Sequence, residues 1–153
     1  MRFWLILPLL LTSCELLDLQ IPEPRNCSTA GSTADLSGEW VIKGVGDRKG
    51  CDDSIWDGSF ELGPSRALRV ESTPTAGTMR DLALGDSISG FQLNGHTEGS
   101  CVDFTTSEAV EGGTVSYAFQ GGAASTSNVA GTFTSTHPLG CIVEGTFEVT
   151  IQP

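Results

Sequence analysis

The sequence predicts an all-β fold built as a single antiparallel domain. Residues 143–151 show the main observation best, because apolar residues or glycine alternate there with polar residues along the whole segment. A period of two is typical of a strand with one buried face, and no segment carries the stripe of an amphipathic helix. Gly, Pro, Asn and Asp fill most of the gaps between such segments, as expected for turns.

Eight segments of the chain have this strand pattern. In chain order they are residues 36–43, 54–62, 66–71, 88–95, 100–106, 114–120, 128–135 and 141–151. Trp56 and Leu62 share one face of the second segment, and Tyr117 and Phe119 share one face of the sixth. Residues 78–84 form a weaker ninth candidate.

A short motif, apolar-x-Gly-x-aromatic, recurs in four of these segments. Its copies are Leu36–Trp40, Trp56–Phe60, Val129–Phe133 and Val143–Phe147. A central glycine leaves room for a neighbouring aromatic ring and lets a strand bend sharply. A sheet that bends repeatedly can close on itself, which removes its exposed edges. We therefore predict an eight-stranded up-and-down barrel, with a two-sheet sandwich as the alternative.

The first residues of the chain have the layout of an export signal. Arg2 precedes the apolar stretch Phe3–Leu11, which is followed by small residues and then Cys14. An apolar core of this length suits a secretory signal peptide, and it is too short to span a bilayer, which takes about 20 apolar residues. We expect a signal peptide over residues 1–13.

A flexible tether is expected between this signal and the β domain. Pro22 and Pro24 are incompatible with a regular element, and residues 28–33 are small and polar. The predicted division is therefore a tether over residues 14–35 and the β domain over residues 36–153.

Leu11-Thr12-Ser13-Cys14 resembles the lipobox of bacterial lipoproteins. This resemblance implies that the Cys14 thiol carries diacylglycerol and that the chain is cut just before it, leaving a protein anchored by acyl chains such as palmitate. Lipoproteins of Gram-negative bacteria are retained in the inner membrane by Asp after the lipidated cysteine. Glu15 stands there in this chain, so the resemblance favours the outer membrane of the cell envelope.

The cysteine count agrees with export. The chain has five cysteines, and lipidation of Cys14 leaves Cys27, Cys51, Cys101 and Cys141. Four cysteines in an oxidising compartment most simply form two disulfides, and none of the spacings resembles a metal or redox pair. Three pairings are open, and we favour the local pairs Cys27–Cys51 and Cys101–Cys141.

The charge of the chain limits its partners. The sequence holds 19 acidic and 8 basic residues, and loss of Arg2 with the signal leaves 7 basic ones. A surface this acidic repels nucleic acid and anionic headgroups. The expected partners are the membrane, through the lipid anchor, and an envelope protein or a small apolar ligand.

Leu36-Ser37-Gly38-Glu39-Trp40 is similar to the Gly-x-Trp start of lipocalins and to the opening strand of avidin-like proteins. Both families imply a closed barrel with a ligand cavity. The resemblance covers five residues, and the C-terminal helix of lipocalins has no counterpart here. It supports the architecture more than it supports ligand binding.

No set of residues indicates catalysis or a cofactor. Residues 85–88, Gly-Asp-Ser-Ile, resemble the nucleophile block of GDSL-type esterases, but they lie mid-chain and the Asp-x-x-His motif of that family is missing. A serine nucleophile also needs a positioned base, and His96 and His137 both read as exposed turn residues. We predict that the protein is not an enzyme and has no cofactor.

The acidic loop after the first strand is the candidate for a metal site. It contains Asp47, Asp52, Asp53 and Asp57. Carboxylates at this density can hold Ca²⁺, but the spacing is not that of an EF-hand and basic residues lie among them. The favoured interpretation is a solvated loop, with no metal.

The aromatic residues fit two functions, of which we favour the first and keep the second as the alternative. If the interior is filled, they form its core, and the domain has a structural or protein-binding role at the envelope. If the interior is open at one end, Trp40, Trp56 and Tyr117 are the expected ligand-binding residues of a carrier for a small apolar molecule. An aromatic-lined cavity of about 300 Å³ or more distinguishes the second function from the first.

Overall fold

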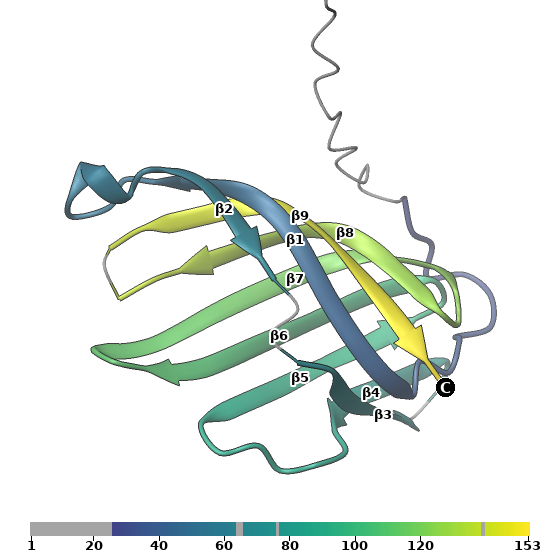
Figure 1. Cartoon of the computed structure of the whole chain (residues 1–153). Helices are drawn as coiled ribbons and strands as arrows, with labels where there is room; N and C mark the ends of the chain where they lie inside the picture. Colours follow the sequence, from purple (N-terminus) through teal and green to yellow (C-terminus); the bar gives the residue numbers. More distant parts are fainter. Residues whose placement is uncertain (1–25, 64–65, 76, 139) are drawn as a thin grey trace, which may run out of the picture.

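The structure is a computed structural model that describes residues 26–63, 66–75, 77–138 and 140–153. The predicted signal peptide and Cys14 lie outside these residues. Within them, nine antiparallel strands form one sheet (Figure 1). The strands are β1 (Gly38–Lys49), β2 (Gly58–Leu62), β3 (Leu68–Pro74), β4 (Met79–Leu84), β5 (Phe91–Glu98), β6 (Cys101–Val110), β7 (Gly113–Ser125), β8 (Asn128–Thr136) and β9 (Ile142–Gln152). One turn of 3₁₀ helix, η1 (Ser54–Trp56), precedes β2.

The first and last strands close the sheet into a ring. β1 pairs with β9 from Glu39 to Lys49, and its opening residues Gly38–Trp40 also pair with β3. Strands β3 to β9 then neighbour one another in chain order, so β1 and β3–β9 form a ring of eight strands. β2 pairs with the second half of β1, beyond the point where β3 leaves it. The predicted all-β antiparallel domain is confirmed, and one closed sheet stands in place of the two-sheet alternative.

Two of the predicted segments differ from the structure. The segment 54–62 starts as η1 and not as a strand, because the Asp53 side chain caps this turn by accepting a backbone hydrogen bond. The weaker candidate, 78–84, is a full member of the ring as β4. Arg80 obscures the alternation of β4, because this charged residue lies on the same face of the strand as the buried Leu82. The Asp35 carboxylate provides the counter-charge that stabilises Arg80 there.

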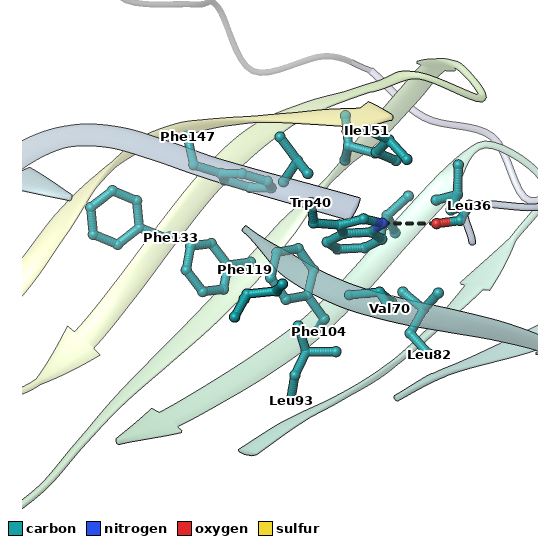
Figure 2. Close-up of a cluster of buried hydrophobic side chains, with 14 of the residues drawn as sticks. Leu36, Trp40, Val70, Leu82, Leu93, Phe104, Phe119, Phe133, Phe147 and Ile151 are labelled. Atoms are coloured by element: carbon teal, nitrogen blue, oxygen red, sulfur yellow. Dashed lines mark hydrogen bonds between the residues drawn. The ribbon is translucent and has the colours of Figure 1, made fainter. Parts of the chain in front are cut away.

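Aromatic side chains fill the middle of the ring, and aliphatic side chains such as Leu36 and Ile151 pack beyond Trp40 (Figure 2). Phe104 and Phe119 stack with their ring centroids 4.4 Å apart, and Trp40 meets Phe104 edge-on at 5.3 Å. Phe147 lies edge-on to Phe119 at 5.0 Å, and edge-to-face contacts of this kind are favourable for aromatic rings. Trp40 has no exposed surface, and its indole N–H donates to the Leu36 carbonyl at 2.8 Å. This part of the interior is therefore packed.

Pairs of facing glycines let neighbouring strands approach each other closely. Gly131 of β8 faces Gly121 of β7, and Gly145 of β9 faces Gly46 of β1. A Cβ atom at Gly131 would lie 2.0 Å from a carbonyl oxygen of β7, and one at Gly145 would lie 2.8 Å from the Phe133 ring. In these two copies of the motif, the central glycine makes room for a ring or for the opposing backbone.

Gly131→Ala is expected to lower the free energy of unfolding by about 1–3 kcal/mol, because the added methyl group must displace backbone on β7. Urea denaturation followed by circular dichroism measures the change. Gly63→Ala is the matched control, because a Cβ atom at Gly63 has no neighbour within 4 Å. Equal stability losses in the two variants would contradict the steric explanation.

The described part of the predicted tether is attached to one end of the ring. Cys27 forms a disulfide with Cys101, the first residue of β6. The Gly99 backbone N–H donates to the Thr33 hydroxyl at 2.8 Å, and Leu36 is buried. We call this end of the ring, which residues 26–37 adjoin, the closed end.

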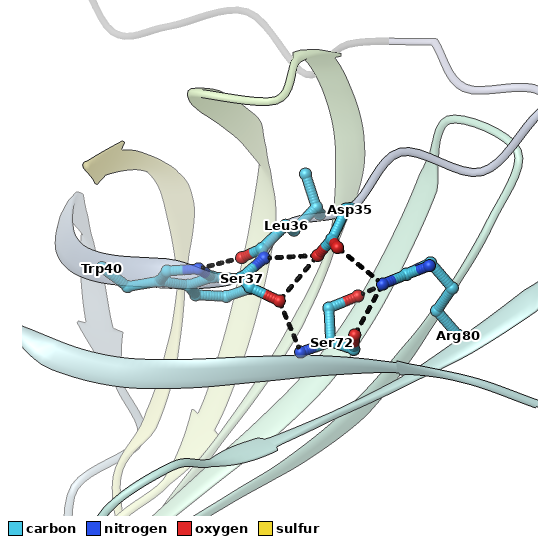
Figure 3. A network of polar contacts seen from close by, with 6 residues as sticks. All are labelled: Asp35, Leu36, Ser37, Trp40, Ser72 and Arg80. Carbon is cyan, nitrogen blue, oxygen red and sulfur yellow. Dashed lines mark hydrogen bonds and ion pairs between the residues drawn. The ribbon is translucent and has the colours of Figure 1, made fainter. Parts of the chain in front are cut away.

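A polar network links the closed end to β3 and β4 (Figure 3). The Ser37 hydroxyl and backbone N–H donate to the Asp35 carboxylate at 2.6 and 3.0 Å. Arg80 lies 2.8 Å from the same carboxylate and donates to the Ser72 hydroxyl at 2.8 Å. The Ser37 hydrogen bonds, and then the Arg80 charge, lower the pKa of Asp35 below 3.8. The ionised Asp35 carboxylate therefore stabilises the fold above pH 3.8, and this stabilisation is lost as the pH falls through the lowered pKa.

Both disulfides join residues that are far apart in the sequence. Cys27 pairs with Cys101 across 74 residues, and Cys51 pairs with Cys141 across 90 residues. Disulfide bonding of these four cysteines is confirmed, but the local pairing that we favoured is wrong. Pairing between β1 and β9 places the last residue of β1 opposite the first residue of β9, and this brings Cys51 beside Cys141.

Candidate functional site: a pocket at the open end of the ring

The interior of the ring is open at the end opposite residues 26–37. β1 and β3 pair over Gly38–Trp40, after which β2 takes the edge of β1. A pocket of about 270 Å³ lies in this region, which we call the open end. Its lining residues are Ile42, Phe60, Glu61, Leu62, Gly63, Arg66, Leu68, Phe91, Thr106, Glu108, Tyr117 and Phe119.

Aromatic side chains from three strands form much of the pocket wall. Phe60 comes from β2, Phe91 from β5 and Tyr117 from β7. The rings of Phe60 and Tyr117 are nearly parallel, with an interplanar angle of 27° and centroids 6.3 Å apart. Phe119 and Leu68 are buried and also line the pocket, which therefore adjoins the packed core. Walls of this kind suit an aromatic ring or a short alkyl body.

Two arginines lie over the phenylalanine rings of this end. The guanidinium carbon of Arg66 lies 5.2 Å from the centroid of Phe91, and that of Arg48 lies 5.8 Å from the centroid of Phe60. Both distances are within the range of a cation–π interaction. Both rings thus present a face on which a cation is stable.

Glu108 adds a carboxylate to the pocket. It continues the inward face of β6, on which Phe104 and Thr106 are buried, and it lies directly across from Phe91 on β5. Among the described residues, ion pairs within 4 Å join Arg80 to Asp35 and His96 to Asp103, and Glu108 takes part in neither. Its carboxylate therefore lines the pocket without a counter-charge at contact distance.

The pKa of Tyr117 is raised above 10.0, first by burial of the phenol and second by the negative charge of Glu108. Both causes disfavour the phenolate. Because the pKa of Tyr117 is higher in the folded state, burial of the neutral phenol stabilises the fold below pH 10, and this stabilisation is lost as the pH rises through the raised pKa.

Tyr117 is the single tyrosine of the chain, so phenolate absorbance reports on it alone. We expect the pKa of Tyr117 to be higher in the native protein than in the urea-unfolded protein. Glu108→Gln should lower the native pKa only in part, because burial is the larger cause. Coincident native and unfolded titration curves would contradict burial of this phenol.

The structure separates the three predicted ligand-binding residues. Trp40 belongs to the core and has no exposed surface, so it is not a pocket residue. Trp56 is 45% exposed on η1 and does not line the pocket. Tyr117 alone of the three lines it. Sequence analysis missed Glu108, because the predicted strand ended at residue 106, although the alternation of β6 continues beyond it.

The residues of the other candidate constellations are not among those that line this pocket. Residues 85–88 form the connection between β4 and β5, where Ile88 makes a single bridge to Phe91 and Ser87 is exposed. His96 faces Asp103 across β5 and β6, with 3.9 Å between Nε2 and the carboxylate oxygen. These two side chains are about half exposed.

The acidic loop between β1 and β2 uses two of its carboxylates to hold its own backbone. Asp57 accepts a hydrogen bond from the Cys51 N–H at 3.1 Å, and Asp53 caps η1. Within the described residues, no three His, Cys, Asp or Glu side chains gather closely enough to hold a metal ion.

The described part of the chain contains no helix with the length and hydropathy needed to cross a bilayer. Comparison of the chain with protein-family models, with curated proteins and with solved structures found no match. The proposed function therefore rests on the residues of this disulfide-stabilised, all-β domain itself.

Proposed function

We propose that this chain is a lipid-anchored protein of the bacterial cell envelope whose β domain binds a small, mainly apolar molecule at the open end of the ring. The observation that carries the proposal is the pocket of about 270 Å³ between Phe60, Phe91 and Tyr117. Concave sites with apolar walls and a few polar groups are the usual form of small-molecule sites. No catalytic step is part of the proposal.

The size of the pocket limits the ligand. Typical ligand pockets measure about 300–1,000 Å³. At about 270 Å³ this pocket lies just below that range and below the volume that sequence analysis set for a carrier, so it suits a molecule smaller than most drug-sized ligands. Trp40, Phe104 and Phe147 fill the interior beyond it. The resemblance to lipocalin- and avidin-like proteins implies a ligand cavity within the barrel. The proposed carrier differs from this expectation, because it binds its ligand at only one end of the interior.

Titration with 2-phenylethanol tests the pocket, followed by calorimetry and by NMR shifts of the protein. We expect saturable binding with shifts at Phe60, Phe91 and Tyr117. Gly63→Trp should abolish binding without loss of stability, because Gly63 lines the pocket and a side chain there meets no neighbour within 4 Å of its Cβ atom. Gly63→Ala is the control that keeps the pocket open. Shifts that survive Gly63→Trp unchanged would contradict binding in this pocket.

The lipid anchor is the second part of the proposal. The lipobox-like residues Leu11–Cys14 support it, and the expected location is the outer membrane. Residues 26–37 adjoin the closed end, so a chain anchored at Cys14 would enter the domain from the side opposite the pocket. The pocket would then remain accessible from the aqueous phase.

Cys14→Ser is expected to leave the protein unprocessed or to release it from the membrane, because the acylated thiol is lost. Membrane fractionation and intact mass of the purified protein measure the two outcomes. Cys14→Ser protein of normal mature size in the membrane fraction would refute the anchor. Such a result would not affect ligand binding by the purified domain.

A protein-binding role is the second candidate function. The exposed large apolar residues of the described chain are Ile55, Trp56, Val110 and Ile142. The Cys51–Cys141 disulfide holds the loop that carries Ile55 and Trp56 near Ile142. Asp52, Asp53 and Asp57 lie in the same loop, so the fitting partner is a protein with an apolar patch bordered by basic side chains.

A photocrosslinking residue at position 56 tests this second function in the anchored protein. We expect one discrete adduct that disappears when Ile55 and Ile142 are changed to serine. The same residue at Thr134, which is exposed on β8, is the control position. Identical adducts from the two positions would contradict a specific surface.

A further inference from the structure

The pocket contains a position at which the chain itself already places a cation. The Arg66 guanidinium carbon lies 5.2 Å from the centre of the Phe91 ring, and Phe91 and Arg66 both line the pocket. Arg66 is exposed and forms no ion pair within 4 Å with another described residue. What holds its charge at this point is therefore the face of the ring, which attracts an ammonium group as well as a guanidinium group.

The strand next to Phe91 brings a carboxylate to the same region of the pocket. Glu108 is directly opposite Phe91 in the pairing of β5 with β6, and its charge is felt at Tyr117. Glu61 also lines the pocket, but it alternates with the inward Phe60 and Leu62 on β2, so Glu108 is the inward carboxylate. The Glu108 carboxylate has no basic partner within 4 Å among the described residues, although Arg66 lines the same pocket.

We propose that the preferred ligand of this pocket is an apolar amine, whose ring or alkyl body lies against Phe60 and Tyr117 and whose ammonium group takes the place of Arg66 over Phe91, beside Glu108. This inference rests on the proposed small-molecule function and names the chemical class of the ligand.

The net charge of the whole protein also favours a cationic ligand. The chain carries a net charge of −11, which raises the local concentration of cations and lowers that of anions. An apolar carboxylate would be repelled by this net charge and by the negative charge of Glu108. A neutral molecule would gain from the aromatic walls but not from the ring face or from Glu108. These differences separate the three kinds of ligand by experiment.

Three probes with the same phenyl body test the proposal: 2-phenylethylammonium, 2-phenylethanol and phenylacetate. Calorimetric titration of the purified protein at low ionic strength gives a dissociation constant for each. A cation–π contact at a partly exposed site corresponds to a gain of about fivefold to tenfold in affinity. We therefore expect the ammonium probe to bind about fivefold to tenfold more tightly than the alcohol, and phenylacetate to bind most weakly.

Charge variants locate the preference within the pocket. Glu108→Gln should remove most of the difference between the ammonium probe and the alcohol, with little effect on the alcohol itself. Glu111→Gln is the matched control, because it makes the same change in charge on the exposed turn between β6 and β7. Arg66→Gln should strengthen binding of the ammonium probe by removing its internal competitor. Arg69→Gln, on the exposed face of β3, is the control for that change.

The results separate this inference from the function on which it rests. Equal affinities for the alcohol and the ammonium probe would overturn the amine preference and leave the small-molecule pocket standing. Equal effects of Glu108→Gln and Glu111→Gln would likewise overturn the assigned position of the ammonium group. Absence of binding by all three probes would overturn the pocket function and the amine preference together.

Discussion

Trp40→Ala is expected to lower the free energy of unfolding by about 3–5 kcal/mol, which is a large part of the stability of a domain of this size. The side chain has no exposed surface and meets Phe104 edge-on, with ring centroids 5.3 Å apart. Its removal leaves a cavity among the aromatic rings of the core and also deprives the buried Leu36 carbonyl of its hydrogen-bond donor. Urea denaturation followed by far-UV circular dichroism measures the loss.

Trp56→Ala provides the matched control for this prediction. Trp56 is 45% exposed on η1, so the same substitution should change the free energy of unfolding by only about 0.5 kcal/mol. The comparison also bears on function, because these two tryptophans were predicted together as ligand-binding residues. Equal destabilisation by the two substitutions would mean that Trp40 is not the centre of the core.

Loss of the Cys51–Cys141 disulfide is expected to be the second large effect. The bond closes a loop across 90 residues, and the chain-entropy model gives about 4–5 kcal/mol for a loop of this length. The double variant Cys51→Ala, Cys141→Ala should therefore unfold at a much lower urea concentration than the parent protein. The loop between β1 and β2 would also lose its covalent link to β9, near the open end of the ring.

The connectivity itself has a direct measurement. Peptide mapping under non-reducing conditions should recover one linked pair that contains Cys27 and Cys101 and another that contains Cys51 and Cys141. The local pairs that sequence analysis favoured would give different masses. Recovery of those local pairs would contradict the ring, because closure by β1 and β9 is what places Cys51 beside Cys141.

The strands of this protein were largely predictable because their pattern is local. Alternation along residues 143–151 requires nothing beyond the side chains of that segment, and it corresponds to β9. The prediction of strands from alternation failed where a tertiary contact places a charged side chain on the inward face. Arg80 hides the pattern of β4, and its place is explained only by Asp35 and Ser72, which reach it from other parts of the chain.

The candidate site was much less predictable than the strands. Tyr117 was anticipated as a pocket residue because an aromatic residue on an inward face can line either a core or a cavity. Whether it does one or the other depends on where the ring stays open, and that depends on the departure of β3 from β1 after Trp40. Glu108 enters the site for the same reason, since an inward carboxylate is tolerated only at an open end.

The sequence by itself determined the all-β class, the disulfide bonding of four cysteines as a set, and the division between polar and apolar strand faces. These depend on composition and on spacings of one or two residues. The tertiary structure alone decided which cysteines pair, which tryptophan is buried and where the interior is open. Each of those depends on contacts between distant parts of the chain. The pairing of the first strand with the last, which joins residues about a hundred positions apart, brings Cys51 beside Cys141, and the departure of β3 from β1 leaves one end open. A local pattern carries no information about contacts at that distance.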